Sequence, residues 1–218
     1  MACDALLQSP QLTTDHGQTE MRYSPDQKEK TRAKILESAA TVFRRQGYHA
    51  TGVDKVMEEA GLTAGGFYAH FPSKDALLAE ALEHIAAKGS NTLERGLDDT
   101  SDREWVRGIV DRYLGDSHRR RPETGCPIPS LAPEVGRAGK APRQAFERLV
   151  RSLIARIAAH LPPEDAEERA IAITALCVGG MALARAVHDP AYSDRILAAC
   201  RDFAHQRLET DVRAKAKR

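Results

Sequence analysis

The chain has 218 residues, enough for one or two domains with a real hydrophobic core. Its 32 Lys and Arg residues nearly balance 31 Asp and Glu residues, which excludes a polybasic coat protein but leaves room for a local basic patch. Aromatic residues make up only 5%, which disfavours a stacking platform for single-stranded nucleic acid.

The sequence gives no signal for a membrane span, a secretion leader or a redox motif. No apolar run approaches the roughly 18 residues of a membrane helix, and the first residues lack a basic leader. The cysteines are far apart in sequence, at Cys3, Cys126, Cys177 and Cys200. We therefore expect a reduced, cytoplasmic protein with no membrane partner.

Helical periodicity dominates the chain after a polar stretch at residues 1–24, which we expect to be a disordered arm. No alternating pattern typical of a strand appears, so the predicted fold is all-α. In chain order, the predicted helices cover 26–46, 53–60, 64–70, 74–88, 102–120, 128–136, 141–161, 163–187 and 192–210.

Residues 51–70 have the pattern of two short helices joined by a tight turn. Gly61 provides the positive φ angle that such a turn needs. The second helix of a helix-turn-helix can enter the major groove of DNA, where small residues permit a close approach. Thr63, Tyr68 and His70 are the polar groups that the second helix offers to DNA.

The same second helix is costly to form. Gly65 and Gly66 each cost about 1 kcal/mol relative to Ala, and a helix of this length does not form alone. We expect Phe67 and Phe71 to face inward and to anchor the segment to the first helix.

Longer motifs make this pattern specific. The stretches GYHATGV at 47–53, AGLT at 60–63 and GGFYAHFPSKDAL at 65–77 closely resemble the DNA-binding domain of the tetracycline-repressor (TetR) family. The resemblance implies a three-helix helix-turn-helix DNA-binding domain over 25–72 and a helical ligand-binding and dimerisation domain over 73–210. A basic tail follows over 211–218, and the implied partner is double-stranded operator DNA.

The resemblance also implies individual DNA contacts. Thr51 would contact a phosphate at the second helix, and Lys74 would hold a phosphate at the start of the fourth. The other candidate DNA-binding residues are Lys55, Thr63, Gly65, Gly66, Tyr68 and His70. Three positions depart from the family pattern: Gly52 lacks a common hydroxyl, Lys55 replaces a frequent acidic residue, and Ala64 replaces a longer polar residue.

A single recognition helix reads few base pairs, so specific binding requires two of them about 34–36 Å apart on a two-fold site. We therefore expect a homodimer that forms through the last two helices. Residues 171–187 are apolar around most of the helix circumference, which requires burial on all sides. The small residues of this segment form a stripe at Ala172, Ala175, Gly179, Ala182 and Ala186.

The middle helices are expected to enclose a pocket for a small-molecule effector of unknown identity. The fourth helix would run from Lys74 at the DNA to this pocket, so that ligand binding tilts it and releases the operator. Repression rather than activation rests on the family resemblance. The candidate ligand-binding residues are His84, Trp105, Tyr113, His118, Cys126, Phe146 and Met181.

Two alternatives stay open. Cys126 precedes a predicted helix and lies near three consecutive arginines at 119–121, which favours a thiolate and a redox or electrophile sensor. A helical ligand-binding protein without DNA binding would suit Gly52 and Ala64. An enzyme is not expected, because no nucleophile–base set, phosphate loop or paired metal ligands can be recognised, and no catalytic residue, cofactor or metal is assigned.

Overall fold

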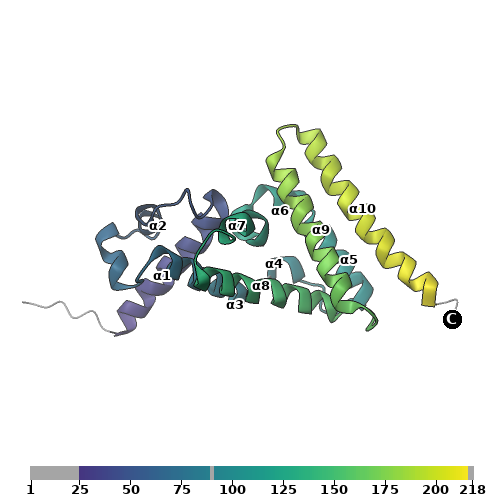
Figure 1. The fold of residues 1–218 in the computed structure, drawn as a ribbon, viewed down its shortest axis with the longest axis horizontal. Helices are drawn as coiled ribbons and strands as arrows, with labels where there is room; N and C mark the ends of the chain where they lie inside the picture. The colour runs from purple at the N-terminus through teal and green to yellow at the C-terminus, as the bar shows by residue number, and fades with distance from the viewer. Residues whose placement is uncertain (1–24, 89–90, 216–218) are drawn as a thin grey trace, which may run out of the picture.

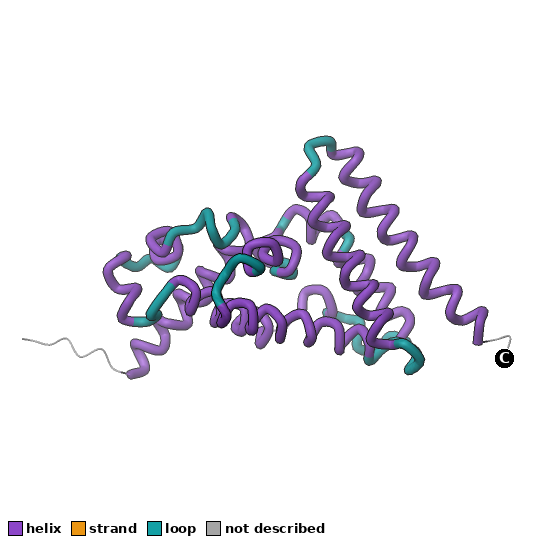
Figure 2. Tube along the Cα trace, viewed as in Figure 1, coloured by secondary structure: helices purple, strands orange, loops and turns teal. Residues whose placement is uncertain are grey.

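The computed structural model describes residues 25–88 and 91–215, and every regular element in these ranges is a helix. This confirms the predicted all-α fold (Figures 1 and 2). The predicted arm at 1–24 lies outside the described residues. The helices are α1 (Pro25–Gln46), α2 (Val53–Glu59), η1 (Ala64–Ala69), α3 (Lys74–Lys88), α4 (Asn91–Glu94), α5 (Asp102–Tyr113), α6 (Asp116–Arg120), η2 (Pro122–Thr124), α7 (Ile128–Val135), α8 (Lys140–Ala158), α9 (Ala166–Ala186) and α10 (Pro190–Lys215).

The first three elements form the predicted helix-turn-helix unit. Gly47 and Gly61 have φ angles of 86° and 64°, so each ends its helix in the left-handed region that glycine favours. Phe43, Met57 and Phe67 are buried between the elements. The unit is therefore held by packing across its three helices rather than by local propensity.

The recognition segment differs from its prediction. Residues 64–70 were predicted to form an α-helix, whereas η1 is a 3-10 helix over Ala64–Ala69. Two consecutive glycines weaken the α-helical state, and the tighter 3-10 turns suit a short connecting piece. The buried ring of Phe67 stacks on Phe71 with centroids 5.9 Å apart, which confirms the expected inward anchors.

Helix α3 connects the helix-turn-helix unit to the rest of the chain. Its first turn is capped by Ser73, whose hydroxyl accepts a bond from the Ala76 N–H at 3.0 Å. Leu77 and Leu78 are buried in the same core as α1, and α3 also packs along α8. The predicted domain boundary at 72–73 stays an interpretation, because one core continues across it.

A second core forms mainly from α5, α9 and α10, and several predicted ranges need correction. The predicted helix over 102–120 divides at Gly115 into α5 and α6, and the sequence patterns missed α4 and η2. Helix α10 continues to Lys215, within the predicted tail. Helices α9 and α10 pack along each other at the end of the molecule far from α2 (Figure 1).

Candidate functional site

The surface of the helix-turn-helix unit presents several of the predicted DNA-binding side chains. Tyr68 is 72% exposed, and Thr63 and Gly65 are also exposed. A Cβ atom added at Gly65 would meet nothing within 4 Å, so its backbone is open to a close approach. Gly66 is half-buried, and a Cβ there would contact the Met57 methyl group at 3.7 Å.

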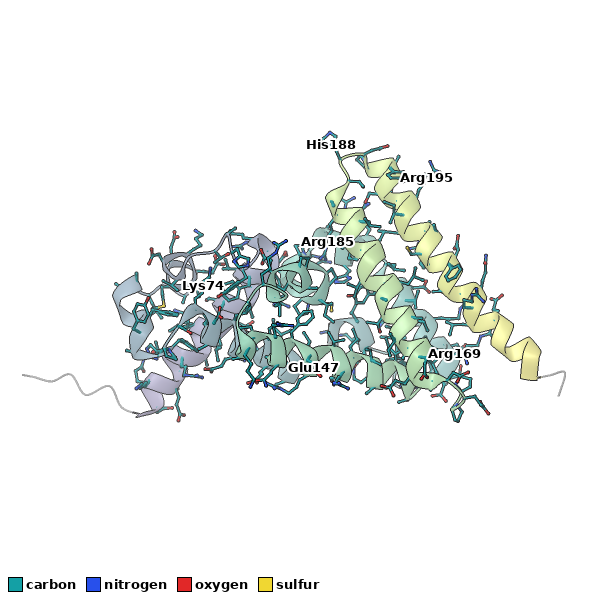
Figure 3. The ribbon with its side chains drawn as sticks, in the orientation of Figure 1. Lys74, Glu147, Arg169, Arg185, His188 and Arg195 are labelled. Carbon is teal, nitrogen blue, oxygen red and sulfur yellow. The ribbon has the colours of Figure 1, made fainter. Side chains whose placement is uncertain are left out.

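Basic side chains lie on the helix-turn-helix unit and at the start of α3. The side chain of Lys55 is 43% exposed and forms an ion pair with Glu58 at 2.8 Å. Burial, followed by the positive charges of Lys28 and Arg32, lowers the pKa of His70. The ammonium of Lys74 lies 4.3 Å from the centre of the Tyr48 ring (its backbone position is labelled in Figure 3), and burial lowers its pKa.

The structure corrects the predicted role of Thr51. The resemblance implies that its hydroxyl contacts a phosphate, but the residue is fully buried and donates its hydroxyl to the Gly47 carbonyl at 2.6 Å. A buried hydroxyl that donates to a carbonyl of the turn cannot contact DNA. Thr51 therefore stabilises the turn between α1 and α2.

A set of hydrogen bonds joins the helix-turn-helix unit to the second half of the chain. The Tyr48 hydroxyl donates to Asp75, and the other oxygen of Asp75 accepts from the Gly139 N–H at 3.0 Å. The Tyr48 N–H donates to the Glu134 carboxylate on α7. These bonds connect α7 and the loop before α8 to the turn after α1.

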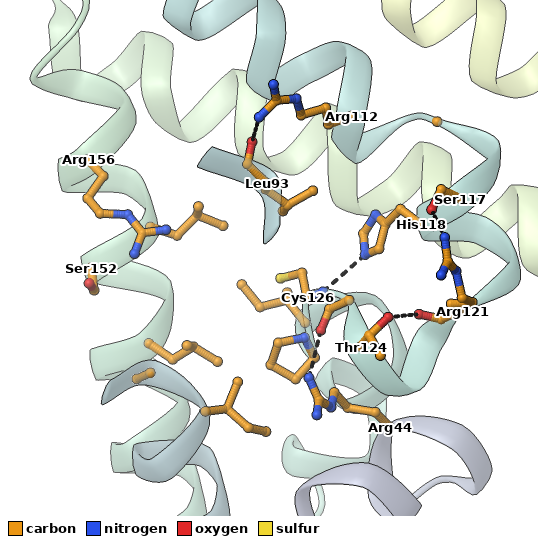
Figure 4. Close-up of a pocket in the computed structure, with 18 of the residues that line it drawn as sticks. Arg44, Leu93, Arg112, Ser117, His118, Arg121, Thr124, Cys126, Ser152 and Arg156 are labelled. Carbon is orange, nitrogen blue, oxygen red and sulfur yellow. Dashed lines mark hydrogen bonds between the residues drawn. The ribbon is translucent and has the colours of Figure 1, made fainter. Parts of the chain in front are cut away.

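A cavity of about 330 Å³ lies among α1, α3, α4, α5, α6, η2, α7 and α8 (Figure 4). This volume lies within the range of small-molecule sites. Its apolar lining includes Ile85, Leu93, Ile128, Leu149 and Leu153. Four arginines, Arg44, Arg112, Arg121 and Arg156, also line it, and they approach from different elements around the cavity.

Only two of the predicted ligand-binding residues, His118 and Cys126, line this cavity. The other five lie elsewhere. His84 bonds to Glu37 on α1 at 2.9 Å, while Trp105 stacks on His160 with centroids 4.0 Å apart. Phe146 packs against the first core, and Met181 and Tyr113 are buried in the second. These five residues stay predictions for an effector site and do not line this cavity, because ring size and polarity in a sequence do not indicate which helix face turns inward.

The sequence did not indicate the arginines of the cavity. Arg44 belongs to α1 in the helix-turn-helix unit, yet it lines the cavity and donates to the Gly125 carbonyl at 3.1 Å. No local pattern distinguishes it from its neighbour Arg45, which is exposed and pairs with Glu59. Only the packing of η2 against α1 brings the two segments together.

His118 holds the turn that contains Cys126. Its Nε2 accepts from the Cys126 N–H at 3.0 Å, so its Nδ1 carries the proton and donates to the Tyr113 carbonyl at 2.6 Å. The bond that Nε2 accepts requires the neutral imidazole, because a protonated Nε2 has no lone pair to accept with. Burial is the main cause that lowers the pKa of His118 to about 4, and His118 is neutral at physiological pH.

The thiol of Cys126 does not have the character proposed from the sequence. Burial raises its pKa, and this exceeds the opposing effects of Tyr113, the Ile128 backbone, Arg185 and Arg156. The resting form at neutral pH is the protonated thiol, so the expected thiolate is wrong. Burial also raises the pKa of Cys177, to about 12.

We expect the His118 contacts to make stability depend on pH. The imidazole has a pKa of about 6.5 in the unfolded chain and about 4 in the folded one. The stabilisation of the folded state by neutral His118 is therefore complete above pH 6.5 and is lost as the pH falls toward 4. The contribution is about 3 kcal/mol, since one pKa unit corresponds to about 1.4 kcal/mol. Urea unfolding of the native chain and of His118→Gln at several pH values measures it. Equal pH dependence of the two proteins would contradict this assignment.

Helix α9 leaves much of its apolar surface uncovered. Ile171 and Leu183 are 46% and 59% exposed, and the predicted small-residue stripe is exposed along the same helix except at Ala182, which is half-buried. Phe203 on α10 is 49% exposed. Among the described helices, α9 alone is long and apolar enough to meet the criterion for a membrane span, and only 39% of its apolar window is buried within the subunit.

Comparison with known proteins identifies the family. A model of "Bacterial regulatory proteins, tetR family" matches residues 35–81. An HTH-type transcriptional regulator of Mycobacterium tuberculosis is 31% identical over 173 residues, which cover 72% of this chain and 86% of the relative. The HTH-type regulator YxaF of Bacillus subtilis is 27% identical over 160 residues, 70% of this chain and 84% of the relative.

Solved structures agree on the fold. Reduced NemR of Escherichia coli has a TM-score of 0.67 at 20% identity and covers 81% of this chain and 96% of its own. A TetR regulator from Chloroflexus aurantiacus has a TM-score of 0.68 at 24% identity, with coverage of 83% and 97%. The chain belongs to the tetR family of bacterial regulatory proteins and is a DNA-binding transcriptional regulator.

Proposed function

We propose that this protein is a cytoplasmic repressor that binds a palindromic operator as a homodimer and releases it when a small molecule enters the cavity. One observation carries the proposal. Two residues of the helix-turn-helix unit bond directly to the second half of the chain. Arg44 donates to the Gly125 carbonyl in the cavity wall, and the Tyr48 N–H donates to Glu134 on α7. A change in the cavity therefore acts on the DNA-contacting unit without intermediate elements.

The exposed face of α9 supports the homodimer. An apolar helix of 21 residues that leaves Ile171 and Leu183 open to solvent needs a cover, and large exposed apolar faces usually mark interfaces. A second α9 and α10 related by a two-fold axis would bury both faces in a four-helix bundle. The symmetry of the operator would then follow from the symmetry of the dimer.

Helix α3 supports a mechanical link between ligand and DNA. It begins at Lys74, whose ammonium lies over the Tyr48 ring, and its last turns carry Ile85 and Ala86 in the cavity wall. A ligand that moves these last turns would tilt the helix and change the separation of the two recognition segments. A coupling free energy of about 1–3 kcal/mol gives a 5- to 150-fold loss of operator affinity.

Selection of bound duplexes from a random DNA pool tests the proposal. We expect an inverted repeat whose half-sites lie about one helical turn apart, bound by two subunits. Sequence-independent binding alone, or no binding at low salt, would contradict the proposal. The second result would favour a helical ligand-binding protein that does not act on DNA.

A further inference from the structure

The charges in the wall of the cavity indicate the chemistry of its ligand, an inference that rests on the proposed function of the cavity as the effector site. Four arginines line the cavity, while Asp116 is the one carboxylate among its described lining residues. Asp116 forms ion pairs with Arg119 and Arg120, whose side chains bind both of its oxygens. Its charge is thus already compensated, and the cavity has an excess of positive charge.

Among the four arginines, Arg44 is the best placed to bind an anionic ligand. Its Nε donates to the Ala40 carbonyl at 2.7 Å and one terminal nitrogen donates to the Gly125 carbonyl at 3.1 Å. Arginine has five N–H donors, so these two bonds leave three for a ligand. Among the described residues, Arg44 forms no ion pair, and Glu37 and Glu123 act on it only at longer range.

Arg112 has a similar character. It donates to the Leu93 carbonyl at 2.9 Å and to the Arg95 carbonyl at 2.7 Å, and it forms no ion pair with a described carboxylate. Arg156, which pairs with Glu94 at 2.8 Å, approaches the cavity from α8 on the side opposite His118 (Figure 4). A half-buried guanidinium that faces only neutral carbonyls has lost water without gaining a counter-charge.

The part of the wall that faces Arg44 is mostly apolar, although Ser152 and Arg156 also line the cavity from α8. Ile85 on α3 and Leu149 and Leu153 on α8 face the cavity that Arg44 enters from α1. A ligand that satisfies both walls needs an anionic group at one end and a hydrocarbon or aromatic body at the other.

We propose that the effector is an amphipathic organic anion whose carboxylate or other acidic group pairs with Arg44 and whose apolar body packs on the wall formed by α3 and α8. The anion would accept from the N–H groups of Arg44 that the Ala40 and Gly125 carbonyls leave free. Because Arg44 belongs to α1, this pairing acts directly on the helix-turn-helix unit. Burial, which lowers the pKa of Arg44, is consistent with a cation that gains from an anionic partner.

Three probes with one hydrocarbon chain and different head groups test the charge selection: decanoate, decanol and decylamine. Isothermal titration calorimetry on the full chain, without DNA, measures their affinities. We expect decanoate to bind at least about tenfold more tightly than decanol, because a charge-assisted hydrogen bond in a partly buried site is worth a factor of this size. Decylamine is expected to bind most weakly.

Arg44→Gln removes the charge and retains an N–H for the Gly125 carbonyl. We expect it to reduce decanoate affinity to that of decanol and to leave decanol binding unchanged. Arg45→Gln is the matched control, because Arg45 is the next residue of α1, is exposed and does not line the cavity. Ser152→Trp fills the cavity and is expected to abolish binding of both probes, with the helical content checked by circular dichroism.

Equal binding of the three probes, tightest binding of decylamine, binding of none of them, or a decanoate preference that survives Arg44→Gln would each overturn the proposal. These outcomes are independent of the proposed function, since no DNA is present. A chain that selects decanoate but ignores every duplex would contradict the proposed function and leave the ligand class intact.

Discussion

Gly179→Arg is expected to yield a monomer that folds normally and loses operator binding. Within the subunit, a Cβ atom at Gly179 would meet nothing within 4 Å, and the residue is exposed on α9. Replacement of an exposed helical glycine removes an intrinsic cost of about 1 kcal/mol, so the subunit itself gains stability. In a dimer packed through α9, the same side chain would occupy the space of the partner helix and bring an unpaired charge into an apolar interface.

The expected loss of operator affinity is at least about a hundredfold, because one half-site provides only part of the contacts of two. Size-exclusion chromatography with light scattering measures the mass, and fluorescence anisotropy measures the affinity for the selected duplex. Ala155→Arg is the matched control, since Ala155 is an exposed small residue on α8. A Gly179→Arg protein that stays dimeric, or a native protein that is monomeric, would contradict the α9 interface.

Phe67→Ala is expected to destabilise the helix-turn-helix unit by about 3–5 kcal/mol, the usual cost of removing a buried aromatic ring. Phe67 is fully buried, stacks on Phe71 and lies edge-on to Tyr68 at 5.1 Å. Because η1 has little intrinsic stability, loss of its anchor should release the whole recognition segment. We expect operator binding to disappear while the α9–α10 face still dimerises.

Tyr68→Ala is the natural companion, since it removes a ring of nearly equal size from the next residue. Tyr68 is 72% exposed, so the free energy of unfolding should change by less than about 1 kcal/mol. The operator affinity should nevertheless fall about tenfold if the hydroxyl contacts DNA. Urea unfolding and anisotropy titrations on both variants separate the two roles. Similar stability losses in the two variants would contradict the assignment of Phe67 as the anchor.

Phe67 and Tyr68 show what local sequence patterns can predict about the orientation of a side chain. Two adjacent aromatic residues were assigned opposite orientations from helical spacing and from the family resemblance, and the structure confirms the buried position of Phe67 and the exposed position of Tyr68. Thr51 shows what such patterns cannot predict, because its hydroxyl donates to the Gly47 carbonyl, four residues earlier in the chain. The family resemblance indicates a threonine at this position, but it does not indicate which group the hydroxyl binds.

The sequence by itself determined the all-α class, the helix-turn-helix with its glycine turn, and the apolar circumference of α9. All three depend on residues within one or two helical turns of each other, where spacing dictates which side chains share a face. The tertiary structure alone decided the composition of the cavity. Arg44 and Gly125 are 81 residues apart in the chain and meet only because α1 packs against η2. Side chains from α1 and from α3 to α8 meet there. Their meeting depends on the crossing angles of the helices, which the local periodicity of the sequence does not specify.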